Sequence, residues 1–154
     1  MAGLSSAIAM ARAGHHVVVA ERATELREIG AALSIWPNAL AALDLLGVGQ
    51  EVRAAGLEAP TGAIHTTSGA TLVRIDTEGT RRAMGGLPVV ILRAGLQAVL
   101  LDACAQLGVE IQLGRALEEV RPHGTRGRVR TTVGEGTFDG LIGADGIGSA
   151  VRAS

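Results

Sequence analysis

The stretch GLSSAIAMARAGHHVVVAE, residues 3–21, decides the fold. Residues 3–13 are good helix formers with apolar side chains repeating on one face, so a helix is predicted with Gly14 just past its end. The valines at 17–19 are typical of a strand that is covered on both faces, as in a parallel sheet. Helix, tight glycine turn and buried strand form the second half of a βαβ unit, whose first strand we expect before Met1.

The remainder of the chain mixes helices with strands. Two long helices are predicted, over 36–47 and 93–108, and residues 77–88 are predicted to be a loop. Strands are predicted over 31–35, 109–113, 128–133 and 137–142, and a hairpin over 63–76 with its turn at Ser68-Gly69. Because the strands beside the strong helices are uninterrupted apolar runs, the pattern favours one α/β, Rossmann-like domain over 1–154 with an inserted β-hairpin.

Composition excludes several classes of protein. The 14 basic residues balance 15 acidic ones, so the chain has no excess of positive charge of the kind that binds nucleic acid or an anionic membrane. The start of the chain lacks the basic region of a signal peptide, and no apolar run approaches the roughly 18 residues of a membrane span. The single cysteine, Cys104, lies on the apolar face of a predicted helix, so we expect a buried thiol and a cytoplasmic protein. The histidines are isolated, and no metal site is predicted.

Glu21 is the first candidate for a binding residue. In a dinucleotide-binding fold, an acid at the end of the second strand accepts hydrogen bonds from a ribose roughly 20 residues beyond the glycines, while the helix N-terminus faces the pyrophosphate. Gly3 would be the third glycine of a G-x-G-x-x-G turn whose first two glycines precede Met1. A chance match of helix, glycine, strand and glutamate is the alternative, because half of this motif is a weak signal.

Asp145 is the second candidate. It stands in GADGIGSAVR, residues 143–152, directly after the predicted apolar strand 137–142. We therefore expect its carboxylate at the carboxyl edge of the sheet, where open α/β sheets bind ligands. The alternative is a solvated Asp-Gly turn.

The string at 143–152 is similar to the Asp-Gly motif of FAD-dependent aromatic hydroxylases, the single-component flavoprotein monooxygenases that include p-hydroxybenzoate and salicylate hydroxylases. Residues 3–22, 27–47 and 92–103 resemble further segments of that family in the same order. The resemblance runs through the whole chain but covers less than half of a full-length member. It implies an incomplete FAD/NAD(P)-binding domain, from which the first strand and the C-terminal part are absent.

The resemblance also implies roles for residues at the adenosine end of FAD. Gly3 would be the last glycine of the phosphate turn, and Glu21 would hold the ribose with Arg22 beside it. Leu117 would lie against the adenine.

Other residues would lie nearer the flavin. Arg93 matches the family arginine that reaches the phosphate side of the flavin. Asp145 and Gly146 match the family motif that is assigned a role in binding both FAD and NAD(P)H. Arg152 is the last residue of that motif. Relatives usually show Gly-Ala-Gly-Ile where this chain has residues 30–33, GAAL. The methyl group of Ala32 is therefore expected to crowd a backbone that lies close to the flavin ring.

The activity implied by the resemblance is hydroxylation of a small aromatic substrate with NAD(P)H and O2. No residue of this chain is predicted to be catalytic, and without its first strand the polypeptide is expected to bind FAD poorly or not at all. Two alternatives remain open. One is a truncated, non-catalytic nucleotide-binding remnant or subunit that needs a partner chain, and the other is a flavin reductase or cyclase that shares the FAD domain.

Overall fold

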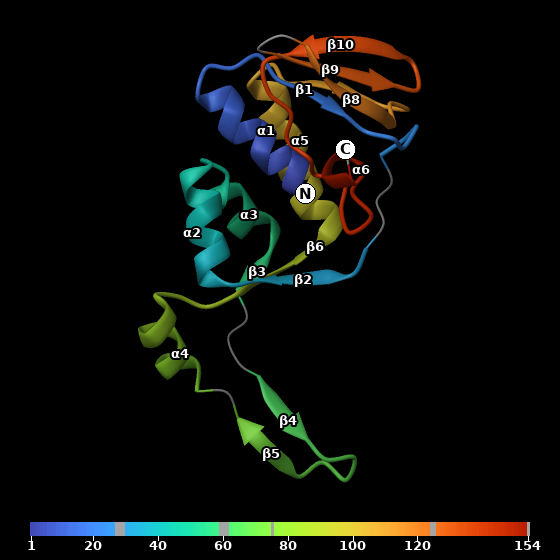
Figure 1. The fold of residues 1–154 in the computed structure, drawn as a ribbon. Helices are drawn as coiled ribbons and strands as arrows, with labels where there is room; N and C mark the ends of the chain where they lie inside the picture. Colours follow the sequence, from blue (N-terminus) through green and yellow to red (C-terminus); the bar gives the residue numbers. More distant parts are fainter. Residues whose placement is uncertain (27–29, 59–61, 75, 124–125, 154) are drawn as a thin grey trace. The chain divides into compact units, whose positions relative to one another are not determined.

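A computed structural model describes residues 1–26, 30–58, 62–74, 76–123 and 126–153 (Figure 1). The chain divides into two compact units: unit 1 holds residues 1–27 and 100–154, and unit 2 holds residues 28–99. The boundary between the units falls inside one helix, α5 (Arg93–Gln106). Among the described residues, no helix is long and apolar enough to cross a membrane.

Unit 1 contains residues 3–21, for which a helix, a glycine turn and a strand are predicted. Helix α1 (Ala2–Arg12) is followed by Gly14 at φ +88° and by β1 (Val18–Ala20), which confirms the predicted helix, turn and strand. Strand β1 pairs in parallel with β7 (Glu110–Gln112), as the valine run indicated. The valines are half-buried rather than covered on both faces. In the described part of the chain, β7 is the one strand that pairs with β1.

The core of unit 1 lies between α1 and the second half of α5. Ile8 and Cys104 are fully buried, and Leu100 is 1% exposed. The Cys104 thiol donates a long hydrogen bond, 3.8 Å, to the carbonyl oxygen of Leu4. Cys104 is buried, which confirms the prediction of a buried thiol, and burial raises the pKa of this thiol.

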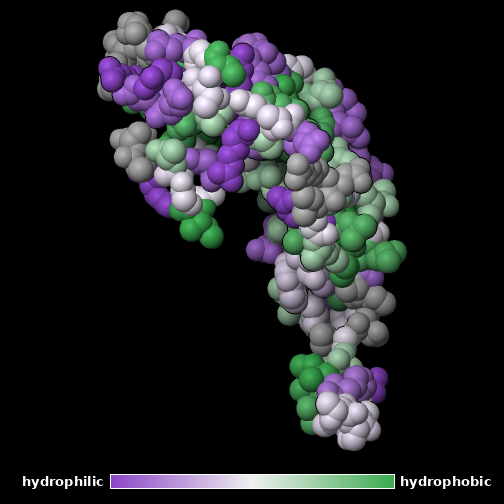
Figure 2. All heavy atoms as spheres, turned by 90° about the vertical axis from the view of Figure 1, so that its right-hand side faces the viewer, coloured by the Kyte–Doolittle hydropathy of each residue, from purple (hydrophilic) through white to green (hydrophobic). Residues whose placement is uncertain are grey.

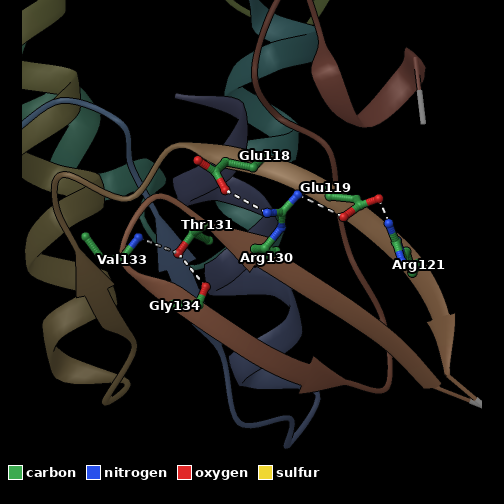
Figure 3. A network of polar contacts seen from close by, with 7 residues as sticks. All are labelled: Glu118, Glu119, Arg121, Arg130, Thr131, Val133 and Gly134. Carbon is green, nitrogen blue, oxygen red and sulfur yellow. Dashed lines mark hydrogen bonds and ion pairs between the residues drawn. The ribbon is translucent and has the colours of Figure 1, made fainter.

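An antiparallel sheet of three strands completes unit 1, in the order β10-β9-β8. Its strands are β8 (Leu117–His123), β9 (Arg126–Thr131) and β10 (Gly134–Phe138). The guanidinium of Arg130 in β9 lies 3.7 Å from the carboxylate of Glu118 and 3.0 Å from that of Glu119, both in β8. Figure 3 shows the three side chains next to one another. Because these ion pairs are exposed, they tie neighbouring strands together with little net stabilisation.

The predicted strand at 137–142 is wrong beyond Phe138. Strand β10 already begins at Gly134, and residues 139–146 belong to no helix or strand. A strand needs a neighbour for its backbone N–H and C=O groups, and no strand of the described residues pairs with this segment.

Unit 2 is built around a second antiparallel sheet, in the order β2-β6-β3. Its strands are β2 (Ala32–Ile35), β6 (Val89–Leu92) and β3 (Leu57–Glu58), and its helices are α2 (Pro37–Leu45) and α3 (Gly49–Ala55). Pro37 occupies the first turn of α2, where its missing N–H costs nothing. Side chains from both helices and from β6 form the core: Leu40, Leu43, Val52, Val89 and Ile91.

The predicted hairpin is confirmed, with β4 (Ala63–His65) antiparallel to β5 (Thr71–Arg74). Its side chains are exposed, including Ile64 and Leu72, and hydrophobic surface is visible on the lowest part of the molecule in Figure 2. The loop predicted over 77–88 is wrong, because residues Thr77–Met84 form helix α4. The carboxylate of Asp76 caps this helix by accepting a hydrogen bond of 2.9 Å from the N–H of Gly79.

Candidate functional site

The first piece of the site is the start of α1 in unit 1. Its N-cap residue, Met1, makes no side-chain capping bond, so the N–H groups of the first turn keep the partial positive charge of a helix N-terminus. A methyl group built on Gly3 in this turn would lie 3.4 Å from the Cβ atom of Ala144. The helix start and the loop at 143–146 are therefore neighbours, although they are far apart in the sequence.

Asp145 lies in that loop with both carboxylate oxygens engaged. Oδ1 accepts a hydrogen bond of 2.5 Å from the hydroxyl of Ser149, and Oδ2 accepts from the N–H groups of Ala150 at 2.6 Å and Val151 at 3.2 Å. The hydrogen bond from Ser149 is the largest cause that holds the pKa of this carboxyl below its usual value. The side chain is thus ionised at neutral pH and caps the short helix α6 (Ala150–Ala153).

The position of Asp145 differs from the expectation that it directly follows a strand. Strand β10 ends at Phe138, and an irregular segment carries the chain to Asp145. The segment contains Gly140 and Gly143, which disfavour a strand. The carboxylate is therefore placed by its own turn and not by the edge of a sheet.

Gly146 and Arg152 complete this turn. Gly146 has φ +86°, a conformation that favours glycine. The guanidinium of Arg152 donates to the carbonyl oxygen of Ile147 at 2.5 Å, so Arg152 closes the loop back on itself.

Glu21 follows β1 directly, as predicted. Its backbone continues the parallel ladder, donating to the carbonyl of Gln112 and accepting from the N–H of Arg115, both at 2.9 Å. Its side chain accepts one hydrogen bond through Oε1, from the N–H of Ala23 at 2.9 Å. Oε2 makes no hydrogen bond to any residue that the structure describes and can accept one from a ligand hydroxyl. Arg22, beside it, is exposed.

Leu117 begins β8, two residues beyond the Arg115 amide that Glu21 binds. A second backbone bond, from Gly114 to the carbonyl of Ala23 at 2.9 Å, keeps the approach to β8 beside the end of β1. Leu117 is half-buried there. Glu21, Arg22 and the segment leading to Leu117 are therefore grouped in unit 1.

Ala32 and Arg93 are grouped in unit 2. Ala32 pairs with Leu92 in the β2–β6 ladder, and the N–H of Arg93 donates to the carbonyl of Ala31 at 3.1 Å. Gly30 has φ +146°, and a methyl group there would lie 2.8 Å from both Cβ and Cδ of Arg93. The Arg93 side chain thus lies close against the backbone that leads into β2.

These groups suit binding rather than acid–base catalysis. Uncapped N–H groups favour phosphate, and a carboxylate oxygen favours a hydroxyl donor such as ribose. Among the described residues, no group of three or more His, Cys, Asp or Glu side chains gathers as a metal site would. Sequence reasoning did not single out Ser149, although an Asp followed four residues later by Ser at a helix start is a capping signal.

Comparisons with known proteins point to one class. Residues 1–154 match the family model described as FAD binding domain. The chain is 34% identical over 157 residues to the FAD-dependent urate hydroxylase of Mycolicibacterium vanbaalenii, and 34% identical over 155 residues to the 3-hydroxybenzoate 6-hydroxylase of Polaromonas naphthalenivorans. These alignments cover 99% and 97% of this chain, and 39% and 38% of the relatives.

Comparison with solved structures points to the same class of proteins. Tetrameric 2-methyl-3-hydroxypyridine-5-carboxylic acid oxygenase superposes with a TM-score of 0.85 at 29% identity, covering 99% of this chain and 39% of that one. The R204Q variant of HpxO from Klebsiella pneumoniae, complexed with FAD, superposes with a TM-score of 0.85 at 28% identity, covering 97% and 38%. The chain therefore spans about 39% of the length of the relatives that it matches.

Proposed function

Because the chain belongs to the FAD binding domain family and its relatives are FAD-dependent monooxygenases, we propose that it is the FAD-binding part of an aromatic hydroxylase. In this proposal, residues 1–154 are a partial Rossmann-like domain, and the whole enzyme hydroxylates a small aromatic substrate with NAD(P)H and O2. The approach of Gly3 to Ala144 is the observation that carries it, since it places the Asp-Gly loop beside an uncapped helix start.

The adenosine end of FAD would be held in unit 1. The first turn of α1, containing Gly3, supplies N–H donors for the pyrophosphate, and Oε2 of Glu21 supplies an acceptor for a ribose hydroxyl. Arg22 and Leu117 would flank the ribose and the adenine. Donors, an acceptor and a half-buried leucine fit the chemistry of this part of the cofactor.

The remaining candidate residues would serve the flavin and NAD(P)H. Arg93 would lie toward the phosphate side of the flavin and Ala32 beside its ring, while Asp145 and Gly146 would present the turn that both cofactors use. When bound, FAD supplies the redox and oxygen chemistry, and the protein supplies binding and orientation. No side chain of this chain is assigned an acid or base role.

The test is a titration of the chain followed by amide NMR, which measures dissociation constants into the millimolar range. FAD is expected to bind more tightly than FMN, because FMN lacks the adenosine that Glu21 and α1 would hold. It is also expected to shift the amides of residues 2–5 and 21–23. Glu21→Gln is expected to weaken FAD binding by roughly tenfold, since a hydrogen bond to a charged acceptor becomes one to a neutral amide.

Glu135→Gln is the matched control, because Glu135 is exposed in β10 and outside the proposed site. It should leave FAD affinity unchanged. Equal binding of FMN and FAD, or equal loss in both variants, would contradict the proposed function.

A further inference from the structure

Ser149 stands at the centre of the Asp145 turn. Its hydroxyl donates to Oδ1 of Asp145 at 2.5 Å and accepts from the N–H of Arg152 at 3.1 Å. A serine hydroxyl has one proton to donate, and that proton is directed at the carboxylate. One side chain therefore joins the loop before α6 to the helix itself.

The carboxylate of Asp145 is held by three donors from its own turn, namely Ser149 and the N–H groups of Ala150 and Val151. Rotating this side chain toward a ligand would break all three hydrogen bonds at once. The Asp145 carboxylate therefore serves as a hydrogen-bond acceptor for its own turn. Residues 144–146 are exposed, so their backbone is accessible to a ligand.

That backbone is confined on two sides within unit 1. A methyl group on Gly143 would lie 2.8 Å from Cβ and Cγ1 of Val151, so the loop packs directly on α6. On the other side, Ala144 meets the first turn of α1 at Gly3. Residues 143 and 144 thus lie between α6 and the start of α1.

We propose that Ser149 is a positioning residue for the cofactor, whose hydroxyl orients Asp145 and thereby sets the backbone of residues 144–146 against the start of α1. The inference rests on the proposed function, since it takes FAD as the ligand of that helix start. Ser149 itself contacts no cofactor in this account. It acts through Asp145, and Asp145 acts through the loop.

The experiment compares Ser149→Ala with Ser149→Thr, which keeps the hydroxyl. Ser149→Ala is expected to weaken FAD binding roughly fivefold in the NMR titration, and Ser149→Thr is expected to restore most of the affinity. Ser68→Ala is the matched control, because the Ser68 hydroxyl also binds a side chain, Thr66, at 2.8 Å, but in the β4–β5 hairpin. It should leave FAD affinity unchanged.

A second measurement separates positioning from general destabilisation. Titration of the Asp145 carboxyl carbon by NMR should show its pKa rising toward the ordinary value in Ser149→Ala and returning to the wild-type value in Ser149→Thr, while circular dichroism shows both variants folded at the titration temperature. A wild-type chain that binds FAD while Ser149→Ala binds it equally well overturns this inference alone. A wild-type chain whose amides at residues 2–5 and 21–23 respond equally to FMN and FAD overturns the proposed function and this inference with it.

Discussion

Gly30→Ala tests the close approach of the Arg93 side chain to the backbone that enters β2. The new methyl group would lie 2.8 Å from Cβ and Cδ of Arg93 and 3.2 Å from its Cγ. The Cδ atom can move away on its flexible side chain. The Cβ atom is fixed by the helix backbone, so relief of the contact requires β2 or α5 to shift.

Two effects add at this position. Gly30 has φ +146°, and forcing a residue with a Cβ atom to positive φ costs roughly 1–2 kcal/mol. Overpacking against a fixed atom costs about 1–3 kcal/mol more. The variant is therefore expected to lose about 2–5 kcal/mol of the free energy of unfolding.

Urea denaturation followed by circular dichroism measures this loss, with Gly108→Ala as control. Gly108 also has positive φ, +70°, but nothing lies within 4 Å of its missing methyl group. The control should therefore lose only the backbone part, roughly 1–2 kcal/mol. Equal losses in the two variants would show that the Arg93 side chain does not lie against Gly30.

Two further predictions concern Ile8 and Asp145. Ile8→Ala should lower the free energy of unfolding by about 2–5 kcal/mol, because Ile8 is fully buried, whereas Leu45→Ala, at a side chain 87% exposed, should change it by no more than about 0.5 kcal/mol in the same denaturation assay. Because the folded-state pKa of Asp145 lies below its ordinary value of 3.8, the stabilisation of its turn is fully present above 3.8 and is lost as pH falls through the lower, folded value. The amide signals of Ala150 and Val151 should therefore stay unchanged from pH 7 down to about 4 and shift only in stronger acid, and a shift centred near neutral pH would refute the capping role.

Local patterns were sufficient to predict α1, β1 and α5. Each carries its signal within its own residues, either an apolar face repeating at helical spacing or a run of β-branched side chains. Helix α4 carries no such signal, since none of its residues is buried. The one local sign of α4 is its capping residue, Asp76. In a polar segment, an aspartate is equally typical of a loop, so the helix was not predicted.

Strand β8 was missed for a different reason. Its sequence LEEVRPH contains adjacent acids and a proline, which argue against a central strand. In the observed order β10-β9-β8 it is an edge strand, where a proline is tolerated. The edge position depends on the partners of the strand and cannot be read from its own residues.

The candidate site divides in the same way. Glu21 follows directly from the end of β1, and Arg93 from the start of α5, so both positions could be predicted locally. The close approach of Gly3 to Ala144 brings together two segments that are far apart in the sequence, and it has no local signature. The prediction of a strand directly before Asp145 was wrong for the same reason. Whether a segment forms a strand depends on a neighbouring strand that pairs with its backbone.

The pairing of β1 with β7 also has a consequence for folding. Val18 meets Glu110, and all of unit 2 is inserted between them. Contacts that close so long a loop form slowly, because the chain must lose much conformational freedom before they are made. During synthesis, the residues of α1 and β1 leave the ribosome well before those of β7 have been translated. Until β7 is available for pairing, the valines of the nascent segment remain exposed to water or to chaperones.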